Sequence, residues 1–438
     1  MINVEKLFEK AKDKGFVDVQ IFKTGTRDLS IEVFDGELEK YEIADTSSLT
    51  IKAIKDGKMV TFVTEVMDDE DIDMIVDAML KNVSVITSVD EAEIYAGDEK
   101  YEELTGMYNP EMENLDIADK IDLVKKLDSF MHKEDSRVKI VECEYAESTK
   151  SVLLQNTKGL KLTDHLNSAY FGASAIVNDG KDQRTGFDLV ISNDMADFKP
   201  EELSNTIVTD AIKALGSKPV PSAKYPIVFD RNAIAVLFSA FQRIFSADNV
   251  QKSMSLLKGK LNTKIGSDKV NIVDDPFLKK SNLSRSFDDE GVATKYKMLV
   301  EAGVLKTYLH NLVTAKKDKI QPTGNGFGGS VAPTNFMLLP GQATKDELIA
   351  SLSNGLYITD VQGAHAGANP VSGDFSLQAM GFVVKDGKVA EPVALITVAS
   401  NFIDFLNDIE EVGNDVKTSF YGITCPSVKV GPLSVSGL

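Results

Sequence analysis

Cysteine and long apolar runs are scarce in this sequence. It contains only two cysteines, Cys143 and Cys425, so a disulfide framework is not expected and a reducing compartment fits. No run of about 18 apolar residues occurs, which argues against a membrane-spanning helix. The first residues mix acidic and basic side chains and lack an apolar segment, unlike a signal peptide. We therefore expect a cytoplasmic globular protein.

Histidine is also scarce, and its spacing argues against one common type of zinc site. The four histidines are His132, His165, His310 and His365. A helical zinc site needs two histidines about one turn apart, so that both rings reach the same ion. The closest two here, His132 and His165, are 33 residues apart. A zinc site of this type is not expected in the chain.

Basic residues are outnumbered by acidic ones. The sequence has 48 lysines and arginines against 67 aspartates and glutamates, a net charge of −19 with a pI near 4.8. Such a surface repels phosphate backbones, because nucleic-acid affinity depends on basic side chains that displace counterions. The densest basic run, residues 316–319, is short. Direct binding to DNA or RNA is therefore not expected.

The first half of the chain predicts helices packed on antiparallel strands. Helices are expected at 3–14, 68–81, 117–133 and 199–215, and strands at 17–22, 29–34, 49–54, 59–64 and within 138–191. Asp56-Gly57 predicts a hairpin turn, because both residues tolerate positive φ. Residues 88–115 are acidic and weakly periodic, which predicts a loop and an additional boundary within this half.

The second half predicts hairpins around one apolar helix. Pro219-Val220-Pro221 interrupts the pattern and predicts a boundary between an N-terminal α+β domain, 1–220, and a C-terminal domain, 221–438. Helices are expected at 232–246 and 344–355, and hairpins through Gly303 and Asp386-Gly387. No regular βαβ alternation occurs. The predicted class is α+β: a mixed α/β N-terminal region followed by a C-terminal domain rich in antiparallel sheet.

Three polar or glycine-rich stretches are candidate functional sites. Asp288, Asp289 and Glu290 could share a proton as acid and base, but neighbours in a strand point to opposite faces and Asp and Gly favour a turn. The stretch PTGNGFGGS, 322–330, lacks the strand and helix that a nucleotide-binding fingerprint requires, which favours a loop near a substrate channel. The stretch QGAHAGANPVSGDFS, 362–376, either lines a binding surface or forms a tight turn.

Three long segments resemble a known family. They are FDDEGVATKYKMLVEAGVLKTYLHNLVTAKK at 287–317, QGAHAGANPVSGDFSLQAMGF at 362–382 and GNDVKTSFYGITCPSVKVGPLSVSGL at 413–438. In that order and spacing they resemble the C-terminal half of the TldD/PmbA family, first described as modulators of DNA gyrase. The family pairs a TldD-type metalloprotease subunit with a homologous PmbA (TldE) subunit. The metalloprotease carries HExxxH on a helix, and this sequence contains no HExxxH.

The resemblance aligns that helix with residues 232–246. In this alignment the first histidine, the glutamate and the second histidine of the motif correspond to Phe238, Ser239 and Arg243. A phenyl ring cannot bind zinc and an arginine repels it. The resemblance also places Cys425 in the tail that completes the zinc shell in metal-bearing members. Without partners, Cys425 is expected to be a buried small apolar residue, because a catalytic thiol needs a base and a cationic neighbourhood.

The resemblance implies a PmbA/TldE-like subunit, non-catalytic by itself, in a cytoplasmic metalloprotease complex that acts on unstructured peptides. Zinc is expected in the TldD-type partner, and the chain in isolation is expected to form a homodimer. In the family, peptide is thought to lie in a cleft between subunits, and the candidates for lining it are His365, Asn369, Ser372, Asp374 and Cys425. Two alternatives stay open: a stand-alone hydrolase that uses no metal, and a gyrase-associated regulator.

Overall fold

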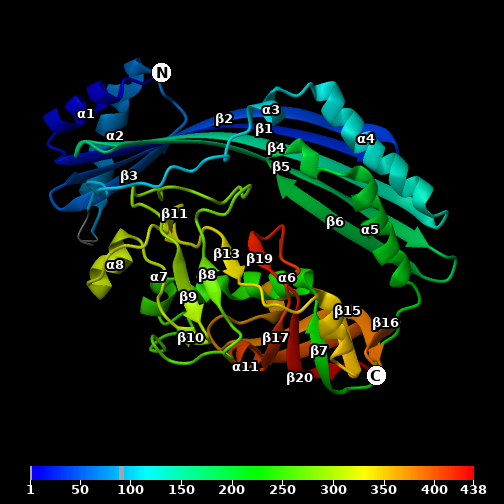
Figure 1. Cartoon of the computed structure of the whole chain (residues 1–438). Helices are drawn as coiled ribbons and strands as arrows, with labels where there is room; N and C mark the ends of the chain where they lie inside the picture. The colour runs from blue at the N-terminus through cyan, green and yellow to red at the C-terminus, as the bar shows by residue number, and fades with distance from the viewer. Residues whose placement is uncertain (1, 88–92) are drawn as a thin grey trace.

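The computed structural model describes residues 2–87 and 93–438. One long, bowed sheet arches over a compact C-terminal part (Figure 1). The last strand of the long sheet ends at Ser192, a helix on that sheet ends at Lys213, and the first strand of the C-terminal part begins at Ala223. No helix among the residues described is long and apolar enough to cross a membrane.

The long sheet is antiparallel, with strand order β3-β2-β1-β4-β5-β6. Its strands are β1 (Asp18–Phe34), β2 (Glu37–Lys55), β3 (Lys58–Thr64), β4 (Val138–Asn156), β5 (Lys161–Asn178) and β6 (Gln183–Ser192). Because β1 pairs with β4, strands from both sides of residues 88–115 belong to the same sheet. The expected additional boundary therefore does not separate two sheets.

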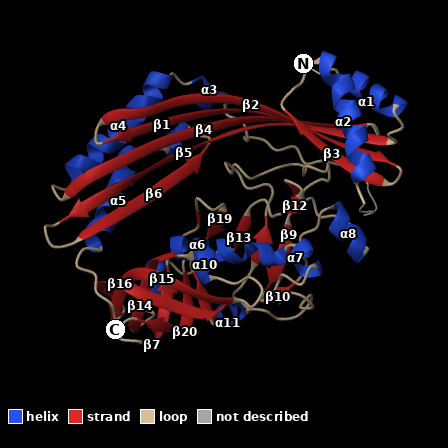
Figure 2. Ribbon diagram, turned by 180° about the vertical axis from the view of Figure 1, so that it is seen from behind, coloured by secondary structure: helices blue, strands red, loops and turns tan. Residues whose placement is uncertain are grey.

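Helices cover the convex face of this sheet at its two ends (Figure 2). One pair is α1 (Val4–Asp13) and α2 (Ile72–Val85), the latter preceded by the 3₁₀ turn η1 (Asp69–Asp71). The other pair is α4 (Ile117–Glu134) and α5 (Pro200–Lys213), beside α3 (Pro110–Asn114) and the 3₁₀ turn η2 (Met195–Asp197). Each pair has its own apolar core, so the long sheet is stabilised from two separate places.

The C-terminal part contains two further six-stranded sheets. The first has the order β16-β15-β14-β7-β20-β17, and β16 also pairs with β20, which closes most of it on itself. Its strands are β7 (Ala223–Phe229), β14 (Asn354–Gln362), β15 (Asp374–Lys385), β16 (Lys388–Asn401), β17 (Ile409–Val412) and β20 (Val428–Ser436).

The second sheet has the order β10-β9-β8-β13-β19-β18. Its strands are β8 (Ile272–Asp274), β9 (Lys297–Glu301), β10 (Val304–Leu305), β13 (Phe336–Leu338), β18 (Lys417–Thr418) and β19 (Ile423–Cys425), and a separate hairpin joins β11 (Gly326–Phe327) to β12 (Ser330–Val331). The helices are α6 (Arg231–Phe241), α7 (Ala247–Gln251), α8 (Leu312–Asp318), α9 (Lys345–Ala350), α10 (Ala364–Gly367) and α11 (Phe402–Asn407), with the 3₁₀ turn η3 (Gln242–Phe245). Helix α6 contacts β14 of one sheet and β19 of the other, so it lies in their shared core.

The predicted α+β class and sheet-rich C-terminal region are confirmed, and so are the turns at Asp56-Gly57 and Asp386-Gly387. Three details are wrong. The predicted strands 17–22 and 29–34 are one strand, β1, because its middle residues lie between the two helix pairs, where no core requires apolar side chains. The helix expected at 344–355 ends at Ala350, since the residues from Asn354 enter β14.

The third wrong detail lies in the predicted loop 88–115. Residues 110–114 form the short helix α3, which begins at a proline and is capped by the Asn109 side chain. Residues 88–92 of that prediction lie outside the residues described.

Candidate functional site

Helix α6 and turn η3 carry the residues that align with a metal motif. Phe238 is completely buried and meets the rings of Phe336 and Phe402 edge to face, with centroids 6.2 and 5.8 Å away. The Ser239 hydroxyl donates to the Val236 carbonyl over 2.7 Å, and Arg243 is exposed. These side chains do not fit a zinc ion. Within residues 2–87 and 93–438, no three His, Cys, Asp or Glu side chains are grouped to hold a metal.

Cys425 lies at the end of β19, in the same core. It has no exposed surface, and its thiol donates to the Arg231 carbonyl at the start of α6 over 3.2 Å. Burial raises the pKa of this thiol far above its ordinary value, so the reactive thiolate is suppressed. In the structure Cys425 is a buried core residue without access to a substrate.

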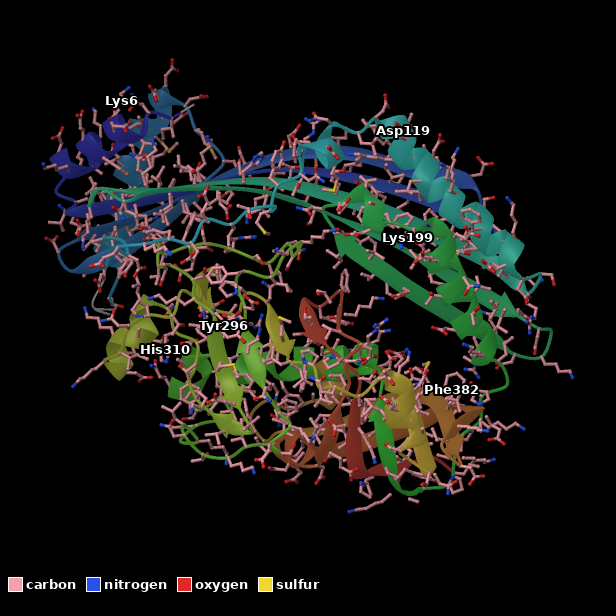
Figure 3. All side chains as sticks on the ribbon, in the orientation of Figure 1. Lys6, Asp119, Lys199, Tyr296, His310 and Phe382 are labelled. Carbon is pink, nitrogen blue, oxygen red and sulfur yellow. The ribbon has the colours of Figure 1, made fainter. Side chains whose placement is uncertain are left out.

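The four histidines lie apart on separate elements. His132 is on α4, and His165 on β5 stacks on Tyr108 with centroids 3.9 Å apart. His310 is buried just before α8 (Figure 3), and burial lowers its pKa, which keeps the ring neutral. His365 is exposed on α10.

Residues 287–293 join the long sheet to the C-terminal part. Phe287 packs against Val152 and Leu154 of β4. Backbone groups on either side of the turn bind the 93–110 region: Tyr101 donates its hydroxyl to the Gly291 carbonyl over 2.7 Å, and the Ala293 amide donates to Asp98 over 2.7 Å. The acidic triplet therefore belongs to a structural joint between distant segments of the chain.

The three acids of this joint also point to different partners. Asp288 is fully buried and accepts amide hydrogen bonds from Glu290, Val292 and Gly326; burial and the charge of Glu290 raise its pKa to about 7. Asp289 accepts from the Gly328 amide, and Glu290 from the Leu312 amide. No two of the three carboxylates share a hydrogen bond in the structure, which supports the turn rather than an acid–base pair.

The glycine-rich stretch 322–330 is explained by the same joint. It forms the hairpin β11–β12, whose turn residues Gly328 and Gly329 have positive φ and open space around them. Two amides of this hairpin, those of Gly326 and Gly328, donate to Asp288 and Asp289. The hairpin is therefore held against the joint rather than arranged around a phosphate.

The stretch 362–376 forms an exposed surface beside α6. Asn369 accepts from the Val371 and Ser372 amides, and Asp374 accepts from the Asn401 side chain over 3.0 Å, which lowers the Asp374 pKa. His365, Asn369, Ser372 and Asp374 are all exposed on this one stretch, whereas Cys425 is buried away from it. Four of the five predicted cleft residues are therefore exposed on the same stretch, and hydrogen bonds join Asn369 to Ser372 and Ser372 to Asp374.

A polar pocket of about 320 Å³ adjoins this surface through Asn401. It lies between β16, α11 and β20, and its polar lining includes Lys224, Asp404, Asn407 and Asp408. Burial and the neighbouring Asp404 raise the pKa of Asp408. The sequence contained no signal for this pocket, because its lining comes from three separate segments of the chain, at residues 224, 399–408 and 432–434.

A second surface, which we call the acidic face, was also missed. It lies on the long sheet away from the helix cores and consists of Glu32, Lys40, Glu42, Glu142 and Glu144. Glu32 and Glu144 are direct cross-strand partners, and Lys40 is 3.3 Å from Glu32. The alternation of acids in the β4 sequence was the available signal, but only the pairing shows which strands place their acids together.

An aromatic hairpin of the C-terminal part reaches the same side of the sheet. Phe420 and Tyr421 form the β18–β19 turn and are 64% and 52% exposed. The Phe420 ring meets Tyr170 of β5 edge to face, with centroids 6.1 Å apart. An ion pair also joins Lys417 to Asp188 on the edge strand β6, where Asp188 is the cross-strand partner of Ala173 on the helix-covered face. Charged and aromatic side chains from the two parts of the chain therefore adjoin one another.

Three family models cover most of the chain. They are the PmbA/TldA metallopeptidase domain 1 at residues 19–83, the central domain at 110–215 and the C-terminal domain at 222–437. A curated relative, a metalloprotease PmbA homolog of Buchnera aphidicola, is 29% identical over 334 residues, 76% of this chain and 73% of that protein.

Solved structures agree in fold over the whole length. A proposed modulator of a DNA gyrase from Thermotoga maritima has a TM-score of 0.93 and 38% identity, with 99% of both chains covered. TldE from Thermococcus kodakarensis has a TM-score of 0.90 at 22% identity, covering 99% of this chain and all of that one, and shows likeness of fold alone.

Proposed function

Because this chain belongs to the TldD/PmbA metallopeptidase family, we propose that it is the subunit without the metal motif in a heteromeric, cytoplasmic peptidase. In this role it does not cleave peptides by itself. It helps to enclose and hold an unstructured peptide, while a homologous TldD-type partner supplies zinc and the catalytic groups.

One observation carries this proposal. The helix that aligns with the metal motif places Phe238 inside an aromatic core, in contact with Phe336 and Phe402. A ligand set there would require polar groups and an open coordination position. The packing of this helix serves the core instead, which supports a structural role for α6 in this chain.

The surface at 362–376 supports the peptide-holding part of the proposal. His365, Asn369, Ser372 and Asp374 present polar groups on an exposed stretch that contacts α6 through α10. Exposed apolar side chains such as Val371 and Leu395, at 52% and 68%, offer contact area in this part for a second subunit. We propose that the isolated chain forms a homodimer through such surfaces and exchanges it for the heteromer.

The alternatives have weaker support. A stand-alone hydrolase would need a nucleophile beside a base, whereas Cys425 is buried with a raised thiol pKa and the acids 288–290 bind backbone amides. A regulator that binds DNA directly would need a basic surface, and the chain carries a net charge of −19.

The test is reconstitution with a TldD-type subunit encoded in the same genome. We expect light scattering to show a heteromer, and we expect hydrolysis of an unstructured peptide only in the mixture. Replacing the first histidine of the partner's HExxxH by alanine should abolish this activity. Replacing Arg243 of this chain by alanine should leave it unchanged, because that exposed side chain holds no metal. A failure to form the heteromer, or equal hydrolysis by this chain alone, would contradict the proposal.

A further inference from the structure

The acidic face carries more negative charge than its neighbours balance. Glu142 and Glu144 lie two residues apart on β4, and so on the same face of the sheet as Glu32, the cross-strand partner of Glu144. Like charges opposite one another destabilise a sheet. Lys40 lies within ion-pair distance of Glu32 and Glu42, 3.3 and 3.6 Å away. One cation thus faces four carboxylates.

The partly buried setting of this face strengthens the attraction between its carboxylates and a cation. Burial and the charge of Glu32 raise the pKa of Glu144, which indicates limited access of water. Burial and the two carboxylates on β4 raise the pKa of Tyr170 to about 12. A negative charge that is partly shielded from water attracts a cation more strongly than the same charge on an open surface.

Exposed aromatic rings border this face. Phe187 on β6 is 57% exposed and shares the face with Glu142, because both residues pair with Ser174 of β5. Phe420 adjoins Tyr170 from the opposite part of the chain, and the Phe420 and Tyr421 centroids are 5.8 Å apart. Large rings left exposed in this way mark binding surfaces. They bind the aliphatic stems and charged heads of lysine and arginine.

We propose that the acidic face, together with the aromatic hairpin at Phe420 and Tyr421, binds a cationic segment of an unstructured peptide. The inference rests on the proposed function and adds a class of substrate to it: peptides bearing arginine or lysine side chains. Charge complementarity selects this occupant. A second copy of the chain is a poorer fit, because its own net charge is −19 and its surface is on average repelled.

The test uses the purified full chain and three fluorescent Gly/Ser peptides of equal length, with arginine, glutamine or glutamate at the same positions. We expect the arginine peptide to bind most tightly, and we expect its affinity to fall as salt is added. The double variant Glu142→Gln/Glu144→Gln should weaken it about tenfold. Phe420→Leu, which keeps an apolar side chain but removes the ring, should weaken it about threefold.

The control removes two charges elsewhere. Glu201→Gln/Glu202→Gln, at the exposed start of α5, changes the net charge equally and should leave arginine-peptide binding unchanged. The Glu142/Glu144 variant should melt no lower than the parent, because it relieves repulsion. The inference would be overturned if both double variants lost the same affinity for the arginine peptide, or if the parent bound the arginine and glutamine peptides equally well. It would also be overturned if the Glu142/Glu144 variant changed the mass of the dimer while the preference for arginine stayed the same.

The proposed function is judged separately. Heteromer formation and hydrolysis of the glutamine peptide do not depend on this preference. If both persist while the arginine preference is absent, the inference alone fails. If the arginine preference is present but no heteromer forms, the proposed function alone fails.

Discussion

Replacing Lys120 by methionine is expected to destabilise the protein by about 3–5 kcal/mol. Lys120 on α4 and Glu147 on β4 form an ion pair of 2.6 Å, and their side chains are only 2% and 7% exposed. The Tyr145 hydroxyl donates to the same Glu147 oxygen over 2.6 Å. Loss of the cation leaves a buried carboxylate that only a neutral donor compensates. Chemical denaturation followed by circular dichroism measures the change.

Two variants separate burial from simple loss of charge. Lys252 and Asp248 form a pair of similar length, 2.8 Å, but their side chains are 61% and 36% exposed. Lys252→Met should therefore cost under about 1 kcal/mol. Lys120→Met combined with Glu147→Gln should recover most of the loss, because glutamine is neutral and still accepts from Tyr145. Equal costs for Lys120→Met and Lys252→Met would contradict the account of this pair.

Replacing Gly303 by alanine is expected to cost about 3 kcal/mol or more, at or beyond the upper end for single substitutions. Gly303 turns β9 into β10 with φ of +77°, and a Cβ atom there would lie 2.1 Å from the Gly266 carbonyl oxygen. The Gly303 amide also donates to the Val270 carbonyl, so the turn cannot move freely. Backbone conformation and steric overlap thus add, and the melting temperature measures their sum.

Gly57 is the matched control for this substitution. It occupies the β2–β3 turn with a similar φ of +73°, but nothing lies within 4 Å of an added Cβ. Gly57→Ala should therefore show the conformational cost alone, about 1–2 kcal/mol. If both alanine variants melted at the same temperature, the overlap with Gly266 would have no energetic weight.

Local patterns predicted much of the fold. Helices α1 and α4 were predictable because their apolar residues recur at helical spacing and because Asn3 and Asp116 cap their first turns. The continuity of β1 was not, because residues 23–28 are polar where the sheet has no helix over it. The alternation of apolar and polar residues in a strand reflects what packs on its two faces. A stretch of strand with no helix packed on it therefore shows no such alternation.

The candidate site, like the fold, was predictable from the sequence only in part. The absence of HExxxH was visible in the sequence, and Cys425 is a buried core residue as the residue-level reasoning expected. The role of Asp288 was not predictable, because its joint depends on partners as distant as Asp98 and Tyr101. The acidic face was missed for the same reason: its charges come from three strands, and only their register places Glu32 opposite Glu144.

The most direct test of the central claim is the zinc content of the separated and combined subunits. Each is purified without chelator and measured by elemental analysis. We expect well under one zinc per chain for this protein alone and about one zinc per TldD-type chain in the heteromer. Alanine at the first histidine of the partner's HExxxH should remove that zinc. Stoichiometric zinc in this chain alone, held by residues of α6 and η3, would contradict the account.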